Sequence, residues 1–379
     1  MSKRFDYVLT GTYPPRECGI ATFTRDTRSS IEMHRQGSTA VIAISDGSYS
    51  YPPEVFAEIP QQDAESYKKT AGMLNSMEIK KVLIQHEYGI FGGKEGEYLL
   101  EFLRELKKPV IASLHTILPL PSKEQKFILQ ELGKHSEFLV VLNSIAIKML
   151  DLEYDMDISK IKLIHHGAPD VPFTDPNDVK PSLGLAGKKV ISTFGLLNTD
   201  KGIEYMIHAM PDIVAEHPDA IYMILGASHP AAVKYYGGDF YREKLENIVK
   251  ILNLTDHVKF VNRYLSQNEL VNFLLATDVY VTPYLNPNQI VSGTLAYAAA
   301  CGKAIVSTPY LYAEEILAHR RGFLVDFKDL EGLGRIIRKL LKNNDLRNEI
   351  SLRTYQFGRS LIWENVGREY VKLLEARQP

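Results

Sequence analysis

The sequence has few cysteines, no long apolar run and no excess of charge of either sign. Two cysteines among 379 residues, Cys18 and Cys301, are too few for a disulfide framework or a cysteine-based zinc site. The 44 basic and 46 acidic residues give a net charge of −2, which excludes a positive field over the whole molecule for nucleic acid. No run reaches the ~18 apolar residues of a transmembrane helix, and the first residues lack the apolar segment of a secretory signal. We therefore expect a cytoplasmic protein.

The composition is otherwise that of a globular protein. Hydrophobic residues make up 45% and charged residues 24%, which excludes intrinsic disorder and collagen-like repeats. At ~150 residues per domain, the length favours two domains. Short β-branched runs alternate with longer segments of helical period, a pattern typical of repeated βαβ units and a parallel sheet. We predict strands at residues 7–10, 39–44, 82–85, 110–114, 138–142 and 161–164, and again at 190–194, 221–225, 258–261, 279–282, 304–307 and 323–325.

A proline-rich segment separates the two sets of predicted strands. It has neither helical nor strand period, which is typical of a linker. We predict an α/β fold of two doubly wound, Rossmann-like parallel-sheet domains facing across a cleft. The N-terminal domain would span residues 1–170, the linker 171–187 and the C-terminal domain 188–358. Residues 359–379 show helical spacing, and this last helix could pack on either domain.

In the first half, glycine and polar residues follow several predicted strands, where open parallel sheets bind ligands. Gly19 precedes a predicted helix whose free N–H groups favour phosphate or sugar oxygens, and an ordinary strand–helix turn is the alternative. His86 and Glu87 follow one strand and His115 follows the next, which favours a polar site over purely structural histidines. The spacing matches no metal motif, so no metal is expected.

In the second half, basic residues and a small-residue segment follow the strands. Lys201 lies at the start of a predicted helix and would suit a phosphate, with a solvated lysine as the alternative. Arg263 also follows a strand. Ser292, Gly293 and Thr294 open a predicted helix whose first N–H groups would form a nest for a diphosphate. A closely packed buried helix is the alternative for that segment.

These motifs resemble the retaining glycosyltransferases of family 4, which have the GT-B fold. The similarity runs from about residue 7 to about residue 345, through YPPRECGIATFT, ASLHT, IKLIHHGAPD, FGLLNTDKGIEYMI, SGTLAYAAACGKAIVSTP and AEEILAHRRGFLVDF. The resemblance implies transfer of a hexosyl group from a UDP- or GDP-hexose to a glycan or lipid-linked acceptor. It further implies retention of configuration, a role in polysaccharide biosynthesis, and no metal or other cofactor.

The resemblance also implies roles for individual residues. Lys201 matches the lysine that binds the donor diphosphate, and Gly19 matches the loop near that group. His115 matches a histidine that contacts the donor sugar near the reacting carbon. Residues 292–294 match the loop whose amides hold the phosphates, and Glu315 matches a glutamate of a later segment.

The sequence departs from the family pattern at three places. Gln289 and Tyr297 stand where a Glu-x7-Glu pair usually contacts the donor sugar and the ribose. A glutamine can still donate and accept hydrogen bonds but carries no charge. Leu196 replaces an arginine beside the diphosphate, for which Arg263 is the candidate substitute. A third departure is at residues 311–312, where a Gly-Gly pair is common.

The expected mechanism has no obvious carboxylate nucleophile. Retention then favours front-face attack, in which the leaving phosphate takes the proton of the acceptor. Glu87 is the carboxylate that we expect to position the acceptor or to act as general base. A structural role as partner of His86 or of a backbone amide is the alternative.

Two other functions fit the same architecture. A non-catalytic nucleotide-sugar or glycan-binding protein is favoured by the departures at Leu196, Gln289 and Tyr297. A sugar-nucleotide epimerase would need a general-base carboxylate beside the sugar, which a glutamine does not supply. We expect no nucleic-acid partner, whereas the lysine pairs 68–69 and 80–81 leave a peripheral contact with the inner face of a membrane open.

Overall fold

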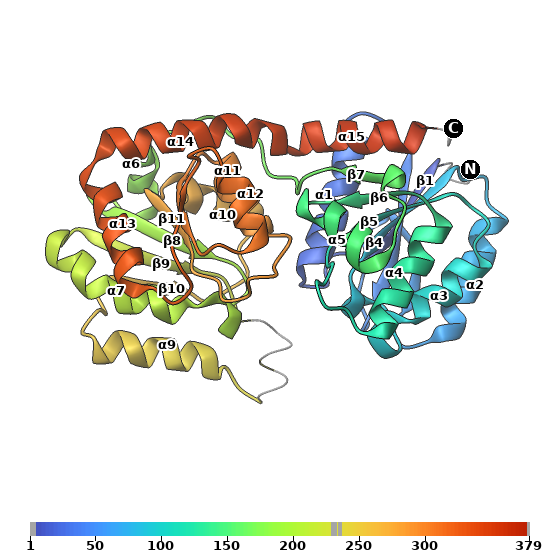
Figure 1. Ribbon diagram of the computed structural model, residues 1–379, viewed down its shortest axis with the longest axis horizontal. Helices are drawn as coiled ribbons and strands as arrows, with labels where there is room; N and C mark the ends of the chain where they lie inside the picture. The colour runs from blue at the N-terminus through green and yellow to red at the C-terminus, as the bar shows by residue number, and fades with distance from the viewer. Residues whose placement is uncertain (1–4, 229–232, 234–236, 377–379) are drawn as a thin grey trace. The chain divides into compact units, whose positions relative to one another are not determined.

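The chain divides into two compact units, each built on one parallel sheet (Figure 1). The computed structural model describes residues 5–228, 233 and 237–376. Unit 1 spans residues 1–167 and 361–379, and unit 2 spans residues 168–360. The first four and last three residues, which belong to the predicted N-terminal domain and C-terminal helix, lie outside the described residues.

Unit 1 contains, within the described residues, a seven-stranded sheet in the order β3-β2-β1-β4-β5-β6-β7. Its strands are β1 Tyr7–Gly11, β2 Thr39–Ser45, β3 Val55–Pro60, β4 Lys81–His86, β5 Val110–Leu114, β6 Ser136–Val141 and β7 Ile161–Leu163. Its helices are α1 Gly19–Glu32, α2 Ala64–Asn75, η1 Tyr88–Ile90, η2 Lys94–Gly96, α3 Tyr98–Glu105, α4 Lys123–His135, α5 Ile145–Tyr154, η3 Ile158–Lys160 and α15 Trp363–Glu375. The strand order reverses between β1 and β4, a switch point at which open α/β sheets bind ligands.

Unit 2 contains, over the part of it that the structure describes, a six-stranded sheet in the order β10-β9-β8-β11-β12-β13. Its strands are β8 Lys189–Phe194, β9 Ala220–Leu225, β10 Val258–Val261, β11 Val279–Thr282, β12 Ala304–Ser307 and β13 Phe323–Leu324. Its helices are α6 Pro176–Val179, η4 Lys180–Leu183, η5 Thr199–Lys201, α7 Ile203–Glu216, α9 Phe240–Ile251, α10 Gln267–Leu275, α11 Gly293–Ala300, α12 Leu311–Leu317, α13 Leu330–Lys342 and α14 Asn344–Gly358, with η6 Arg359–Leu361 at the boundary to unit 1. The order here reverses between β8 and β11.

Burial on both faces explains why the central strands are apolar. Every residue of β2 and of β9 is buried, as expected for parallel strands covered by helices on both faces. Such strands appear in a sequence as near-continuous apolar runs. All twelve predicted strands are therefore confirmed, with ends that differ by at most two residues. The prediction of two doubly wound parallel sheets is confirmed with them.

The sequence analysis missed one strand, β3. It lies at the edge of its sheet and pairs only with β2. Among its six residues only Ile59 is buried, and it includes Glu58 and ends at Pro60. A charge and a proline are typical of edge strands, which must not offer a free edge for pairing. These features remove the apolar pattern by which the other strands were recognised.

The predicted linker is not free of secondary structure. Residues 171–187 lie within unit 2 and contain α6 and η4, each four residues long. Helices of this length are too short to show a helical period, which is why the sequence analysis missed them. Local signals are present nonetheless, because Asp175 accepts the N–H of Asn177 and Pro176 occupies the first turn of α6.

The last helix, α15, packs against α1 in unit 1. The ring of Trp363 lies 5.5 Å from that of Phe23, centroid to centroid. Gly367 brings the two backbones close together, since a Cβ at this glycine would lie 2.3 Å from the carbonyl oxygen of Ser30. The helix is therefore an integral part of unit 1.

We predict that Gly367→Ala destabilises unit 1. The added methyl group must push α15 away from α1, and overpacking of this kind costs about 1–3 kcal/mol. Gly72→Ala in α2 is the matched control, because its Cβ would meet only the Glu105 carboxylate at 3.9 Å. We expect the control to be neutral or stabilising by about 0.4–1 kcal/mol. Urea unfolding of both variants measures the difference, and equal midpoints would contradict the packing described here.

Candidate functional site

In unit 2, the start of α11 is built as predicted. Ser292 is the N-cap residue, and its Oγ accepts the N–H of Leu295 at 3.3 Å. Gly293 and Thr294 form the first turn of the helix. The first N–H groups of any α-helix have no carbonyl partner within that helix and carry the positive end of its dipole. This end of α11 can therefore accept an anion.

Lys201 is held beside the segment that follows β11. It ends η5 and is followed by Gly202, whose φ of 59° lies in the left-handed region. A Cβ at Gly202 would lie 2.1 Å from the carbonyl oxygen of Pro283, so only glycine allows this approach. The N–H of Leu285 also donates to the carbonyl of Asp200 at 2.8 Å. Two segments that are far apart in the sequence are thus fixed side by side.

Tyr284 connects Lys201 to the start of α11. The Lys201 Nζ lies 3.8 Å from the centroid of the Tyr284 ring. The Tyr284 hydroxyl and Thr294 Oγ1 are 2.8 Å apart, and Thr294 Oγ1 and Ser292 Oγ are 3.0 Å apart. We call Lys201, Tyr284, Ser292 and Thr294 the Lys201 cluster. The structure therefore brings together three residues that the sequence analysis selected separately.

The sequence analysis missed Tyr284. Its side chain is fully buried, and its ring stacks on that of Tyr310 at 5.4 Å between centroids. A signal was present, because Tyr284 follows the predicted strand 279–282 after a single proline. A tyrosine at the end of a buried strand is, however, most simply explained by packing.

The ammonium of Lys201 has no acceptor among the residues that the structure describes, where its contact is the Tyr284 ring. Burial lowers the pKa of Lys201 to about 8, and the charge of Asp200 opposes this shift. An ammonium group has three donors. A partly buried lysine that lacks a carboxylate or carbonyl partner is suited to bind an external anion.

The other predicted donor residues of unit 2 have partners of their own. The side-chain amide of Gln289 donates to the carbonyl of Val291 at 2.8 Å. Tyr297 is buried in α11, and its ring lies 6.1 Å from that of Phe194. Glu315 is half-buried on α12, where its backbone carbonyl accepts from Arg321.

Arg263 is engaged at the start of α10. Its guanidinium donates to the Glu269 carboxylate at 2.6 Å, and its side chain is 54% exposed. Glu269 in turn accepts from Ser266 in a capping box. The pKa of Glu269 is lowered to about 2, first by Arg263 and then by Ser266. A role for Arg263 in place of an arginine at Leu196 stays a prediction.

In unit 1, His115 lies directly after β5. Its Nε2 is 2.9 Å from Oε1 of Gln85, and Phe23 packs edge-on against its ring at 4.6 Å between centroids. Burial lowers the pKa of His115 to about 3. The imidazole is therefore neutral at physiological pH.

Glu87 lies after β4 and is held by a hydroxyl and by backbone. Its carboxylate accepts the Thr116 hydroxyl at 2.5 Å, as well as the N–H groups of Tyr88 and Gly89. Burial is the largest influence on this carboxyl group and raises its pKa. These partners match the alternative that a backbone amide holds Glu87. The ring of His86 packs instead against Tyr88, at 4.9 Å between centroids.

Gly19 begins α1, where the Cys18 thiol accepts the N–H of Ala21 at 3.4 Å. No heavy atom of the described structure lies within 4 Å of the position that a Cβ would take at Gly19. Packing within the protein therefore does not require glycine here, and the space beside the helix start is open.

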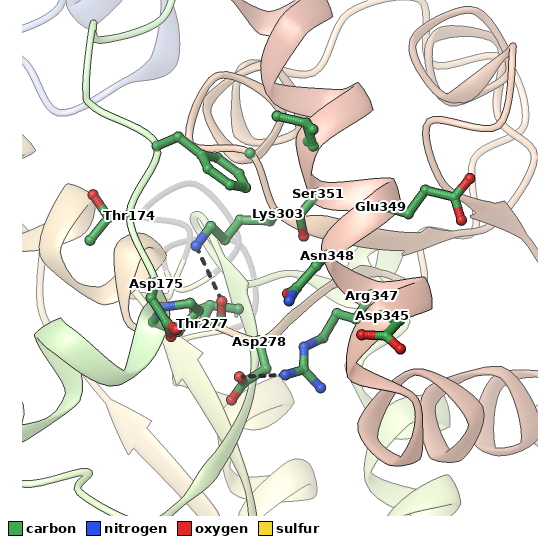
Figure 2. A pocket seen from close by; sticks show the side chains of 14 residues that line it. Thr174, Asp175, Thr277, Asp278, Lys303, Asp345, Arg347, Asn348, Glu349 and Ser351 are labelled. Atoms are coloured by element: carbon green, nitrogen blue, oxygen red, sulfur yellow. Dashed lines mark hydrogen bonds and ion pairs between the residues drawn. The ribbon is translucent and has the colours of Figure 1, made fainter.

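A pocket with a volume of about 570 Å³ lies in a different part of unit 2 (Figure 2). It is at the amino ends of β11 and β12, whereas the Lys201 cluster is at the opposite, carboxyl end of β11. Asp278 and Lys303 are buried residues of its lining. Asp278 pairs with Lys180 at 2.8 Å, and Lys303 donates to the carbonyls of Leu275 and Thr277 at 3.1 and 3.3 Å. Because these carbonyls lie at the end of α10, the charges serve the packing of unit 2. None of the predicted site residues lines this pocket.

Neither a membrane-spanning helix nor a metal-binding cluster is found among the described residues. Within residues 5–228, 233 and 237–376, no helix is long and apolar enough to cross a membrane. Over the same part of the chain, no group of three or more His, Cys, Asp or Glu side chains is arranged to hold a metal ion.

Residues 176–357 match the family model described as glycosyl transferases group 1. Over these residues the chain is similar to group 1 glycosyltransferases. The matched stretch comprises most of unit 2, including the whole Lys201 cluster.

Curated relatives of the chain are distant. The chain is 24% identical to spore coat protein SA of Bacillus subtilis, over 52% of each sequence. It is 25% identical to an uncharacterized glycosyltransferase of Methanocaldococcus jannaschii, over 64% of this chain and 59% of that protein. The chain thus spans about half the length of the curated relatives it matches.

Solved structures share the fold over nearly the whole chain. HepE of Anabaena, solved with UDP and glucose, has a TM-score of 0.76 and 16% identity, covering 97% of this chain and 99% of that one. Sucrose-phosphate synthase of Thermosynechococcus elongatus has a TM-score of 0.77 and 16% identity, covering 97% and 98%. At this identity the likeness shows the fold, and the predicted GT-B fold is confirmed.

We predict that Asp278→Ala destabilises unit 2. The substitution leaves Lys180 buried without its carboxylate, and breaking a buried pair in this way costs about 3–5 kcal/mol. Glu349→Ala is the control, since it removes an exposed partner of Arg353 from the same unit and such pairs contribute about 0.2–1 kcal/mol. Urea unfolding measures both, and a small loss for Asp278→Ala would show that the buried pair is not needed.

Proposed function

We propose that the protein is a retaining glycosyltransferase that moves a hexosyl group from a UDP- or GDP-hexose to a glycan or lipid-linked acceptor. The observation that carries this proposal is the Lys201 cluster. It places an ammonium without a protein acceptor beside the start of a helix, and both features favour a diphosphate. The cluster lies inside the matched glycosyltransferase domain.

The relatives support a nucleotide-sugar donor. HepE of Anabaena was also solved with UDP-glucose. One relative is named as a GDP-mannose-dependent mannosyltransferase of Corynebacterium glutamicum, and another as a D-inositol 3-phosphate glycosyltransferase of Nocardioides. Release of UDP from UDP-glucose, or of GDP from GDP-mannose, would identify the nucleotide of the donor.

The proposed chemistry depends on charge at the leaving group. Breaking the anomeric C–O bond builds negative charge on the diphosphate, and preorganised donors that stabilise such charge are each worth about 10²–10³ in rate. Lys201 and the first N–H groups of α11 would supply this stabilisation without a metal ion. In a front-face reaction the acceptor oxygen bonds to the anomeric carbon on the face that the diphosphate leaves, so the configuration is retained. The leaving phosphate takes the acceptor's proton.

Roles for the unit 1 residues complete the proposal. Neutral His115 would contact the donor sugar. Glu87, whose carboxyl pKa is raised by burial, would position the acceptor or, in place of the leaving phosphate, take its proton as general base. Gly19 would leave room for the ligand, and Gln289 and Glu315 would add polar contacts to the donor. Tyr297, which is 7% exposed, would be a further contact to the donor, although its phenol is a poor substitute for a ribose-binding carboxylate.

We place the reaction in the cytoplasm, and the lysine pairs do not strengthen a membrane contact. Lys81 is buried with the Glu137 carboxylate, and Lys80 is paired with Asp6. Lys68 pairs with Glu101. Three of the four lysines are therefore already neutralised by carboxylates and form no free basic patch.

A non-catalytic nucleotide-sugar-binding protein is the second candidate. Two observations favour it: the Gln289 amide is turned to its own loop, and Tyr297 is buried. Release of UDP or GDP from UDP-glucose and GDP-mannose, with and without a panel of glycans, separates the two. Tight donor binding with no release across the panel would favour the binding protein.

We predict that Lys201→Ala lowers kcat/KM for the donor at least tenfold, because the diphosphate loses its ammonium partner. The thermal shift produced by UDP or GDP should fall in parallel. Lys188→Ala, which removes an exposed lysine of the same unit, is the control and should leave both quantities unchanged. Near wild-type values for Lys201→Ala would remove this lysine from the site.

We also predict a pH dependence of donor binding. Only the protonated lysine attracts the diphosphate, and the free Lys201 has a pKa of about 8. The Kd for UDP-glucose should be constant below pH 7.5 and should rise as the pH passes above about 8. Calorimetric titration of Lys201→Arg provides the comparison, since a guanidinium stays charged throughout. The same rise in both proteins would assign the dependence to another group.

A further inference from the structure

Gln85 is a polar side chain buried inside the sheet of unit 1. It precedes the last residue of β4, pairs with Ser113 of β5, and has 0% exposure. The two strands continue together, since the N–H of His115 donates to the carbonyl of His86 at 3.0 Å. This register places the Gln85 Oε1 2.9 Å from the Nε2 of His115.

Packing fixes the orientation of both side chains. A Cβ at Gly11 of β1 would lie 3.0 Å from Cβ of Gln85 and 3.1 Å from Oγ1 of Thr24, so Gln85 fills the space beside that glycine. On its other side His115 is held by the edge of the Phe23 ring. Both side chains are therefore confined by packing, since Gln85 is 0% and His115 7% exposed.

Gln85 is more than a packing residue. Its side-chain Nε2 is buried and has no acceptor among the described residues. A buried amide donor without an acceptor costs stability, and an apolar side chain of the same size would avoid that cost. The bond to His115 therefore accounts better than stability does for a glutamine at this position.

A carboxamide oxygen can only accept, so the hydrogen of the His115 ring must be on Nε2. We propose that Gln85 is a positioning residue that fixes this tautomer of His115 and so leaves Nδ1 as a hydrogen-bond acceptor. Through Nδ1 the histidine would accept a hydroxyl of the sugar, a role that rests on the proposed function. His115 would then bind and orient its ligand without donating a proton.

The surroundings of His115 support a neutral ring. Burial lowers its pKa to about 3, and the neighbouring histidines His166 and His86 add to this shift. Burial lowers the pKa of those two rings as well, to about 4 and about 3. One proton per ring is the expected state, so the position of that proton decides what His115 can do.

NMR of the full chain with ¹⁵N-labelled histidine tests the tautomer directly. The His115 signals are identified by their absence in His115→Gln. We expect protonated Nε2 and bare Nδ1, unchanged from pH 5 to pH 8. Protonated Nδ1 in the wild-type protein would overturn the proposal without recourse to any variant at position 85.

Variants then test the role of Gln85. Gln85→Met keeps the size but removes the acceptor, and a mixture of both tautomers is expected. Gln85→Glu places a carboxylate beside the ring, which raises the pKa of His115 and adds a proton to Nδ1. Gln130→Glu on α4, whose amide bonds the carbonyl of Tyr154, is the matched control and should leave His115 unchanged. A wild-type His115 spectrum in Gln85→Met would overturn the proposal.

The kcat/KM for the donor tests whether Nδ1 of His115 accepts a hydroxyl of the sugar. At pH 7, Gln85→Glu should lower kcat/KM for UDP-glucose or GDP-mannose at least tenfold, with recovery as the pH rises through the raised pKa of His115. A purely structural defect would not recover with pH, and a pH-independent loss would overturn the role of Nδ1. Absence of turnover by the wild-type protein on every donor would overturn the proposed function and that role, while the NMR result would still decide the tautomer.

Discussion

Burial of parallel sheets on both faces determines where this protein can place polar chemistry. Within strands such as β2 and β9 every residue is buried, because helices cover both faces, and most of the side chains are apolar. Functional polar groups are therefore found at the strand ends, and parallel strands bring all their carboxyl ends to one edge. Tyr284 and Lys201 follow β11 and β8, and His115 follows β5. Gln85 is a polar residue within β4, and its side chain contacts His115.

Three buried or partly buried lysines of unit 2 differ in whether the protein supplies an acceptor for the ammonium group. Lys180 is paired with Asp278, and Lys303 caps carbonyls at the end of α10. Both have protein acceptors, and both lie beside the pocket at the amino end of the sheet. Lys201 has an aromatic ring in place of an acceptor. Pocket size alone would select the amino end of the sheet, whereas the lysine without a described acceptor lies at the carboxyl end.

The sequence predicted the elements that have strong periodic signals and missed those that do not. The central strands and the start of α11 were found because apolar runs and an N-cap serine are local features. The edge strand β3 and the short helix α6 were missed because charge, proline and small size hide their period. Lys201, Ser292 and Thr294 could be selected individually. Their connection through Tyr284 depends on the tertiary contact between two distant loops, which no local pattern contains.

The position of α15 has a consequence for biosynthesis. Unit 2 is one continuous stretch of chain, whereas unit 1 needs its first 167 residues and also residues 361–379. Trp363 and Gly367 fit against Phe23, Gly167 and Ser30, residues that leave the ribosome long before them. The earlier part of unit 1 must wait with an uncovered apolar surface while the whole of unit 2 is translated. The final nineteen residues thus act as a closing segment, and nascent chains that stop short of them would expose the α1 surface to chaperones or to aggregation.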